Sequence, residues 1–197
     1  ACKAARVQLA IGYRLHFEPN NLEMVRLARE KTFGTVKVIE TAAGFPIGDP
    51  KQWRLDKKLS GGGSLMDIGI YALQAARYIS GEEPVSVSAQ WSITDPVKFK
   101  PGVEESVLFT LKFPSGVIAN CASSYGVNLN RFRANAERGS FELQPALNYE
   151  GIKGRSRSQA GPKDWDLPVV DHFAAEMDAF ADCILNNKPT TVPGEEG

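Results

Sequence analysis

Residues 61–71, GGGSLMDIGIY, place a carboxylic acid, Asp67, and a phenol, Tyr71, four residues apart behind three glycines. Residues four apart lie on the same face of a helix, one turn from each other. An acid and a phenol placed in this way could move a proton to or from a bound molecule. A second interpretation is structural, because Ser64-x-x-Asp67 matches a capping box with Asp in place of Glu. Capping explains Asp67 and the glycines but not Tyr71, and both interpretations stay open.

The helix that carries these residues is expected over residues 64–80 and is ended by Gly81. Its core face is apolar and consists of Leu65, Ile68, Ala72, Ala75, Ala76 and Ile79. A second stripe beside it is polar but carries little charge, and consists of Asp67, Tyr71, Gln74 and Tyr78. Such a stripe suits a cleft, although half-buried tyrosines are also common without any site.

The elements around this helix predict an α+β fold, in which a mostly antiparallel open sheet packs on helices. Further helices are expected over residues 21–31 and 171–189. Alternating apolar and polar residues predict strands at 35–45, 84–94, 106–113, 116–126, 132–145 and 147–152, and an apolar run predicts a buried strand within 7–17. Residues 46–63 and 153–163 are rich in Gly and charge and are expected to be loops.

The composition excludes several classes of function. Lys and Arg total 23, as do Asp and Glu, so the net charge is zero. This argues against nonspecific binding to nucleic acid or to an anionic membrane surface. No apolar run reaches the roughly 18 residues of a membrane span. Three separate cysteines and two histidines, His16 and His172, lack metal-ligand spacing, so no metal site is predicted and reduced thiols are expected.

Several motifs carry a resemblance to a known family. Residues 61–84, the opening IGYR, the loop QWRL and the tail ILNNKP…VPGEEG resemble the C-terminal half of the glucose–fructose oxidoreductase/inositol dehydrogenase (Gfo/Idh/MocA) family. The resemblance covers nearly the whole chain. It implies that residues 1–14 end a Rossmann domain, and that 15–197 form a substrate-binding and oligomerisation domain. It also implies NAD or NADP, bound mainly by a Rossmann domain outside this chain that would carry the catalytic lysine.

The same resemblance implies roles for individual residues. Asp67 and Tyr71 would be catalytic, although much of the family has His where Tyr71 stands, a departure shared with the glucose–fructose oxidoreductase branch. A tyrosine with its ordinary pKa near 10 is a poor base, so a neighbouring ammonium group such as that lysine would be required. Cofactor contacts are expected from Tyr13, Arg14, Trp53 and Arg54, and substrate contacts from Gly63, Gln74 and His16. The alternatives are packing roles for the aromatic residues and solvation for the arginines.

The sequence therefore predicts half of an oxidoreductase that transfers hydride between a sugar or polyol and nicotinamide. A noncatalytic sugar-binding or assembly module of the same fold is the alternative. Alone, the chain is expected to be inactive. A homodimer or homotetramer is expected through an exposed sheet face that carries Val87, Ala89 and Trp91. The cytoplasm is the expected compartment, with export as the alternative.

Overall fold

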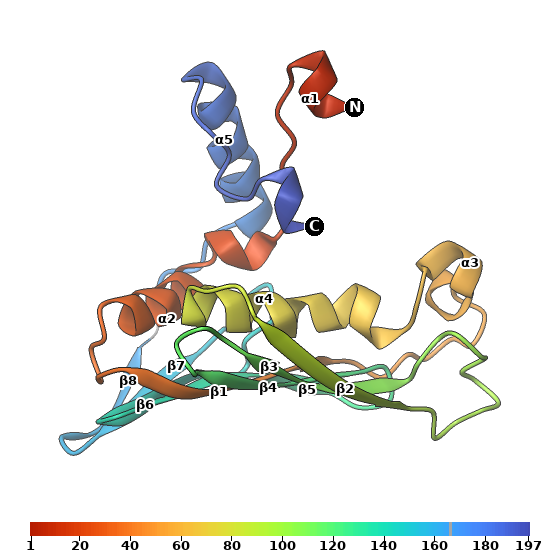
Figure 1. Ribbon diagram of the computed structural model, residues 1–197, viewed down its shortest axis with the longest axis horizontal. Coiled ribbons are helices and arrows are strands. Elements are labelled where there is room, and N and C mark those ends of the chain that lie inside the picture. The colour runs from red at the N-terminus through yellow and green to blue at the C-terminus, as the bar shows by residue number, and fades with distance from the viewer. Residues whose placement is uncertain (166) are drawn as a thin grey trace.

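The computed structural model describes residues 1–165 and 167–197, and these form one eight-stranded sheet with helices on one side (Figure 1). The strand order is β2-β3-β4-β1-β5-β6-β7-β8. The strands are β1 (Val36–Gly44), β2 (Ser86–Ser92), β3 (Ser106–Lys112), β4 (Ile118–Ser124), β5 (Leu129–Ala136), β6 (Gly139–Leu143), β7 (Gly154–Ser158) and β8 (Gly161–Trp165). Strands β1 and β4 pair in parallel and the other neighbours are antiparallel. The predicted α+β class is confirmed.

Two helices lie along the sheet, α2 (Pro19–Arg29) and α4 (Ile70–Ser80) (Figure 1). A π-helical turn, η3 (Leu65–Gly69), leads directly into α4. Shorter elements are α1 (Cys2–Ala5), η1 (Arg14–Phe17), η2 (Trp53–Leu55), α3 (Lys57–Ser60) and η4 (Gly194–Glu196). Helix α5 (His172–Leu185) and α1 project away from the sheet on the side of the helices (Figure 1). In this part of the chain, no helix is long and apolar enough to cross a bilayer.

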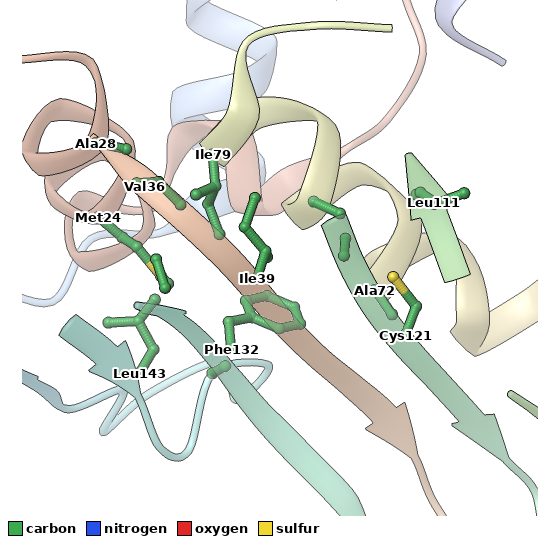
Figure 2. Close-up of a cluster of buried hydrophobic side chains, with 14 of the residues drawn as sticks. Met24, Ala28, Val36, Ile39, Ala72, Ile79, Leu111, Cys121, Phe132 and Leu143 are labelled. Atoms are coloured by element: carbon green, nitrogen blue, oxygen red, sulfur yellow. The ribbon is translucent and has the colours of Figure 1, made fainter. Parts of the chain in front are cut away.

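The core lies between the sheet and helices α2 and α4 (Figure 2). Ile39 of β1 and Ala72 of α4 are fully buried, and Phe132 of β5 is 1% exposed. The small Ala72 lets the helix approach the sheet, where the larger side chains of β1 and β5 fill the space. Burying an Ile or Phe side chain stabilises a fold by about 1.5–3 kcal/mol. This packing holds α4, and hence Tyr71, against the sheet.

Four expected elements differ in the structure. The expected loop over 46–63 contains the short helices η2 and α3. Residues 7–11 form no strand, and Ala10 makes only an isolated bridge to Pro193. Residues 147–152 are irregular. The expected loop over 153–163 is instead the β7–β8 hairpin, which turns at Gln159 and Ala160, directly before Gly161 with φ +98°. The hairpin was missed because its exposed face carries charged residues and gives little apolar alternation.

Helix α5 forms where it was expected, but several of its apolar residues are exposed. Its apolar residues Phe173, Met177 and Ile184 are 52%, 60% and 53% exposed. The buried side chains are His172, Glu176 and Cys183. Helix α5 stands off the sheet, so its apolar residues reach only local neighbours. Phe173 lies near the ring of Tyr149, and Met177 lines a small cavity with Phe17.

The open face of the sheet is apolar in part, but its residues are not those predicted. Val38, Leu108 and Ile118 lie on it and are 41%, 60% and 45% exposed. Val87 pairs with the buried Leu111, and directly paired residues share one face of a sheet. Val87, and with it Ala89 and Trp91, therefore lies on the helix side. These residues are exposed because β2 is an edge strand that no helix of the described residues covers.

Candidate active site

The carboxylate of Asp67 is held by two side chains from other parts of the chain. Its Oδ2 atom accepts hydrogen bonds from Arg54 Nε at 2.7 Å and from the Tyr125 hydroxyl at 2.9 Å. Among the described residues its Oδ1 atom has no hydrogen-bond partner. Tyr125 is fully buried, and its burial, followed by the charge of Asp67, raises the pKa of its hydroxyl. The hydroxyl therefore stays protonated as a donor, and one oxygen of Asp67 is left for another molecule.

The capping interpretation of Asp67 is wrong, because Glu104 caps this helix. The Glu104 carboxylate accepts from the backbone amides of Gly63 at 2.8 Å and Leu65 at 3.0 Å. The Ser64 hydroxyl makes a 3.0 Å hydrogen bond with Ser123 of β4 instead of capping. Glu104 satisfies amide donors that helix N-termini leave open. Asp67 is consequently free to face Arg54 and Tyr125.

The π turn changes the relationship between Asp67 and Tyr71. Within it, a side chain built on Gly69 would come within 2.9 Å of the Ser123 side chain, so glycine lets η3 lie close to β4. Thr41 of β1 donates to the carbonyl of Ala72, at 2.9 Å. Because a π turn interrupts the 3.6-residue period, the predicted single stripe does not form. Asp67 faces the Arg54 side, and Tyr71 has different neighbours.

The glycine run is needed for a close approach, but the approaching group is Glu104 and not a ligand. A Cβ atom on Gly63 would lie 2.0 Å from the Glu104 carbonyl oxygen. The amide of Gly63 already donates to Glu104. The amide of Gly63, which was expected to contact substrate, is therefore already used by a hydrogen bond within the chain.

Tyr71 lies beside Arg14 and lines an apolar cavity of about 140 Å³. The other predicted residues in that cavity are Tyr13, His16 and Gln74, contributed by η1, its flank and α4. The His16 ring packs edge-on against Tyr78 at 4.8 Å, and burial lowers the pKa of His16. Gln74 is 6% exposed and donates to the carbonyl of Glu196, as does the Tyr13 hydroxyl. The cavity thus brings four predicted residues together, but two of them, Gln74 and Tyr13, already make hydrogen bonds within the chain.

Arg14 is buried, at 6% exposure. Its guanidinium lies 5.4 Å from the ring centre of Tyr71 and 4.3 Å from that of Tyr149. It donates to the carbonyl of Leu147, and its Nη1 atom lies 3.2 Å from Nδ1 of His172. This arginine is enclosed by its own chain, which does not favour the predicted cofactor contact.

Trp53 and Arg54 lie together next to Asp67. The Trp53 side chain is 49% exposed, and the Arg54 guanidinium lies 4.6 Å from its ring centre. Arg54 uses Nε to hold Asp67, which raises the pKa of its guanidinium. Its two terminal nitrogens have no hydrogen-bond partner in the described part of the chain. An exposed indole beside free guanidinium donors fits a nicotinamide nucleotide, whose ring can pack on Trp53 and whose oxygens can accept from Arg54.

An open groove of about 530 Å³ lies between the Asp67 and Arg14 groups. Ile68 and Phe45 line it on the Asp67 side, where Phe45 contacts Arg54, and Tyr149 lines it on the Arg14 side. Its remaining lining residues are Gly44, Asn128, Asn130, Leu147, Asn148 and Glu150. Amide and carboxylate groups next to an aromatic ring are suited to a polyhydroxylated molecule.

Sequence reasoning missed the residues that support the site, namely Tyr125, Glu104 and Tyr149. Tyr125 is 58 residues from Asp67, and only the packing of η3 on β4 brings them together. The sequence predicts a strand over 147–152, whereas these residues are irregular and residues 147–150 line the groove. No group of three or more His, Cys, Asp or Glu residues that could hold a metal occurs in the described residues. All three cysteines are free thiols.

Comparison with known proteins decides the family. The sequence model described as the GFO/IDH/MocA C-terminal domain matches residues 21–142. The chain belongs to this family. The family prediction is thereby confirmed, and the fold agrees with that of a putative oxidoreductase from Thermotoga maritima (TM-score 0.79, 17% identity, 99% of this chain and 59% of that one).

Two relatives are more similar in sequence. The chain is 30% identical to D-xylose 1-dehydrogenase [NADP(+)] of Haloarcula marismortui over 202 residues, which cover 100% of this chain and 56% of that protein. It is 45% identical to the aldose-aldose oxidoreductase from Caulobacter crescentus, solved in complex with glycerol, with a TM-score of 0.94 over 99% of this chain and 59% of that one. The chain thus spans less than two thirds of the length of these relatives, which are sugar dehydrogenases and oxidoreductases.

Proposed function

We propose that this chain is the substrate-binding half of an NAD(P)-dependent oxidoreductase that acts on a sugar or polyol. Residues 1–14 would join it to a Rossmann domain that binds most of the cofactor. The observation that carries the proposal is the carboxylate of Asp67, fixed through one oxygen by Arg54 and Tyr125 next to the groove that Ile68 lines. Membership of a family whose named relatives act on sugars supports the same substrate class.

Different residues of the chain bind a substrate hydroxyl, orient it and exchange its proton. The Oδ1 atom of Asp67 accepts a hydrogen bond from that hydroxyl and orients it. Arg14 lies over the ring of Tyr71 and over that of Tyr149 in the groove wall. The Tyr71 hydroxyl, which has no hydrogen-bond partner among the described residues, would exchange the proton as acid or base. Asn128 and Glu150 in the groove bind the remaining hydroxyls. The nicotinamide supplies the hydride acceptor when it is bound, and Trp53 and Arg54 would hold it from this side.

Full-length protein and nicotinamide absorbance test the proposal. Wild type is expected to reduce the cofactor with at least one member of a panel of aldoses and polyols. Tyr71→Phe is expected to lower kcat by about 10²–10⁴-fold, the usual contribution of a positioned acid or base. Tyr78→Phe, two turns along α4, is the matched control and should keep wild-type turnover. Absence of reduction with every member, despite bound cofactor, would favour the noncatalytic sugar-binding module.

We also propose that the open face of the sheet is a subunit interface. Val38 and Ile118 pair directly and leave apolar surface exposed there, and Leu108 is exposed further along the same face, opposite Ala122. Contiguous exposed apolar patches on a folded domain commonly mark association surfaces. A homodimer or homotetramer would bury this patch and leave the groove, which lies at the end of β1, accessible.

A further inference from the structure

The guanidinium of Arg14 lies at the junction of the elements that surround Tyr71. It packs against the ring of Tyr71 on α4 and against the ring of Tyr149 in the groove wall. It also donates to the carbonyls of Leu147 and Asn148 in that wall. One side chain therefore connects the proposed acid/base to the proposed substrate groove.

This arginine is also unusual in its electrostatics. It is 6% exposed, and no carboxylate of the described residues lies within ion-pair distance of it. Its Nε atom is buried without a hydrogen-bond partner, and the remaining contacts are two carbonyls and the ring of His172. A buried cation without a carboxylate is costly to fold, so a purely structural role would be served better by an apolar residue. The cost is consistent with a role in function.

We infer that Arg14 is a positioning residue that fixes the ring of Tyr71 relative to the groove wall at 147–149. This rests on the proposed function, because it assigns Arg14 a role through Tyr71. The planar guanidinium can stack on both tyrosine rings while its nitrogens bond the two carbonyls, which an ammonium group cannot do. The inference replaces the cofactor contact that the sequence predicted for Arg14.

Steady-state kinetics of the full-length enzyme test this role. Arg14→Met removes the hydrogen bonds and the charge but keeps the length of the side chain. It is expected to lower kcat by about 100-fold and to raise the KM for the sugar, because small misplacements of reacting groups have effects of this size. The KM for the nucleotide should not change. Arg157→Met, on the exposed face of β7, controls for the loss of an arginine and should behave as wild type.

A double-mutant cycle with Tyr71→Phe separates positioning from an independent effect. If Arg14 acts through Tyr71, Arg14→Met should cause less than a threefold further loss of kcat in the Tyr71→Phe background. An equal fold loss in both backgrounds, or a rise in the nucleotide KM alone, would overturn the inference. If Tyr71→Phe itself leaves kcat unchanged, the proposed function of Tyr71 fails instead.

Arg14→Lys covers the case in which Arg14→Met does not fold. Lysine keeps the charge and most of the length but loses the planar stacking and the paired donors. With a wild-type melting temperature, it should retain about a tenth of the wild-type kcat. Full wild-type kcat in Arg14→Lys would contradict the positioning role.

Discussion

Arg54 and Asp67 lie 2.7 Å apart, from Nε to Oδ2, although Arg54 belongs to the short helix η2 and Asp67 to a π turn. The side chains are 29% and 28% exposed, so the pair sits at the edge of the solvent and is not a deeply buried salt bridge. Tyr125 donates to the same Oδ2 atom from the buried side. The buried Tyr125 hydroxyl therefore holds the Asp67 carboxylate in one orientation. A pair of mobile surface side chains would not fix that orientation as well.

Tyr125→Phe tests this support. The substitution removes one hydroxyl from a fully buried side chain and leaves its ring in the core. We expect a loss of about 1.5–3 kcal/mol in the free energy of unfolding, the range for a hydrogen bond to a charged group. We also expect a lower kcat, because Asp67 gains freedom. Urea unfolding and kinetics of the full-length protein measure the two effects, and unchanged values for both would show that Arg54 alone holds Asp67.

Gly63→Ala tests the close approach of the glycine run to Glu104. A Cβ atom would lie 2.0 Å from a backbone oxygen and 2.5 Å from a backbone nitrogen of Glu104, neither of which can move easily. We expect destabilisation of about 3 kcal/mol, at the upper end for overpacking. Gly48→Ala is the matched control, since nothing lies within 4 Å of the position that its Cβ atom would take and its φ is not in the left-handed region. A melting temperature as high for Gly63→Ala as for Gly48→Ala would contradict this geometry.

The helices of the core could be predicted because their apolar period is strong. The α4 pattern holds from Ile70 to Ser80, and Gly81 ends the helix with φ +77° as expected. The relationship between Asp67 and Tyr71 could not be predicted, since a π turn leaves no mark in the side-chain pattern. Its cause is tertiary, namely the contact of Gly69 with Ser123.

The neighbours of the predicted site residues could not be predicted from the sequence either. The sequence identified Arg14 as important, but its burial depends on the loop at 147–149 and on His172, over 130 residues away. Helix α5 shows a related limit. Its apolar residues fit one helical face, whereas the helix buries Glu176 and exposes Met177. Amphipathic pattern shows which face can be buried but not what buries it.

Glu176→Gln tests a consequence of that burial. The carboxylate is 7% exposed and has no hydrogen bond or ion pair within the described part of the chain, and burial raises the pKa of Glu176. A raised carboxyl pKa gives stability that is present below the unfolded-state pKa and lost as pH rises through the folded-state pKa. Glutamine stays neutral throughout. The variant should therefore match wild type near pH 4 and melt at a higher temperature at pH 7, as measured by thermal unfolding across that range. A wild-type melting temperature at pH 7 above that of Glu176→Gln would mean that the charged form has a partner.

Ile118→Arg distinguishes the two sheet surfaces that could join subunits. Ile118 is 45% exposed on the open face beside Val38, with which it pairs directly. A charge there would be buried at the proposed interface without a partner, which costs several kcal/mol and should dissociate the oligomer. Val87→Arg places the same charge on the helix side of the edge strand β2, at a residue that is 65% exposed. Sedimentation velocity of the full-length variants should show smaller species for Ile118→Arg and an unchanged oligomer for Val87→Arg. The reverse result would move the interface to β2 and its flank, because only a buried position can respond so strongly to an added charge.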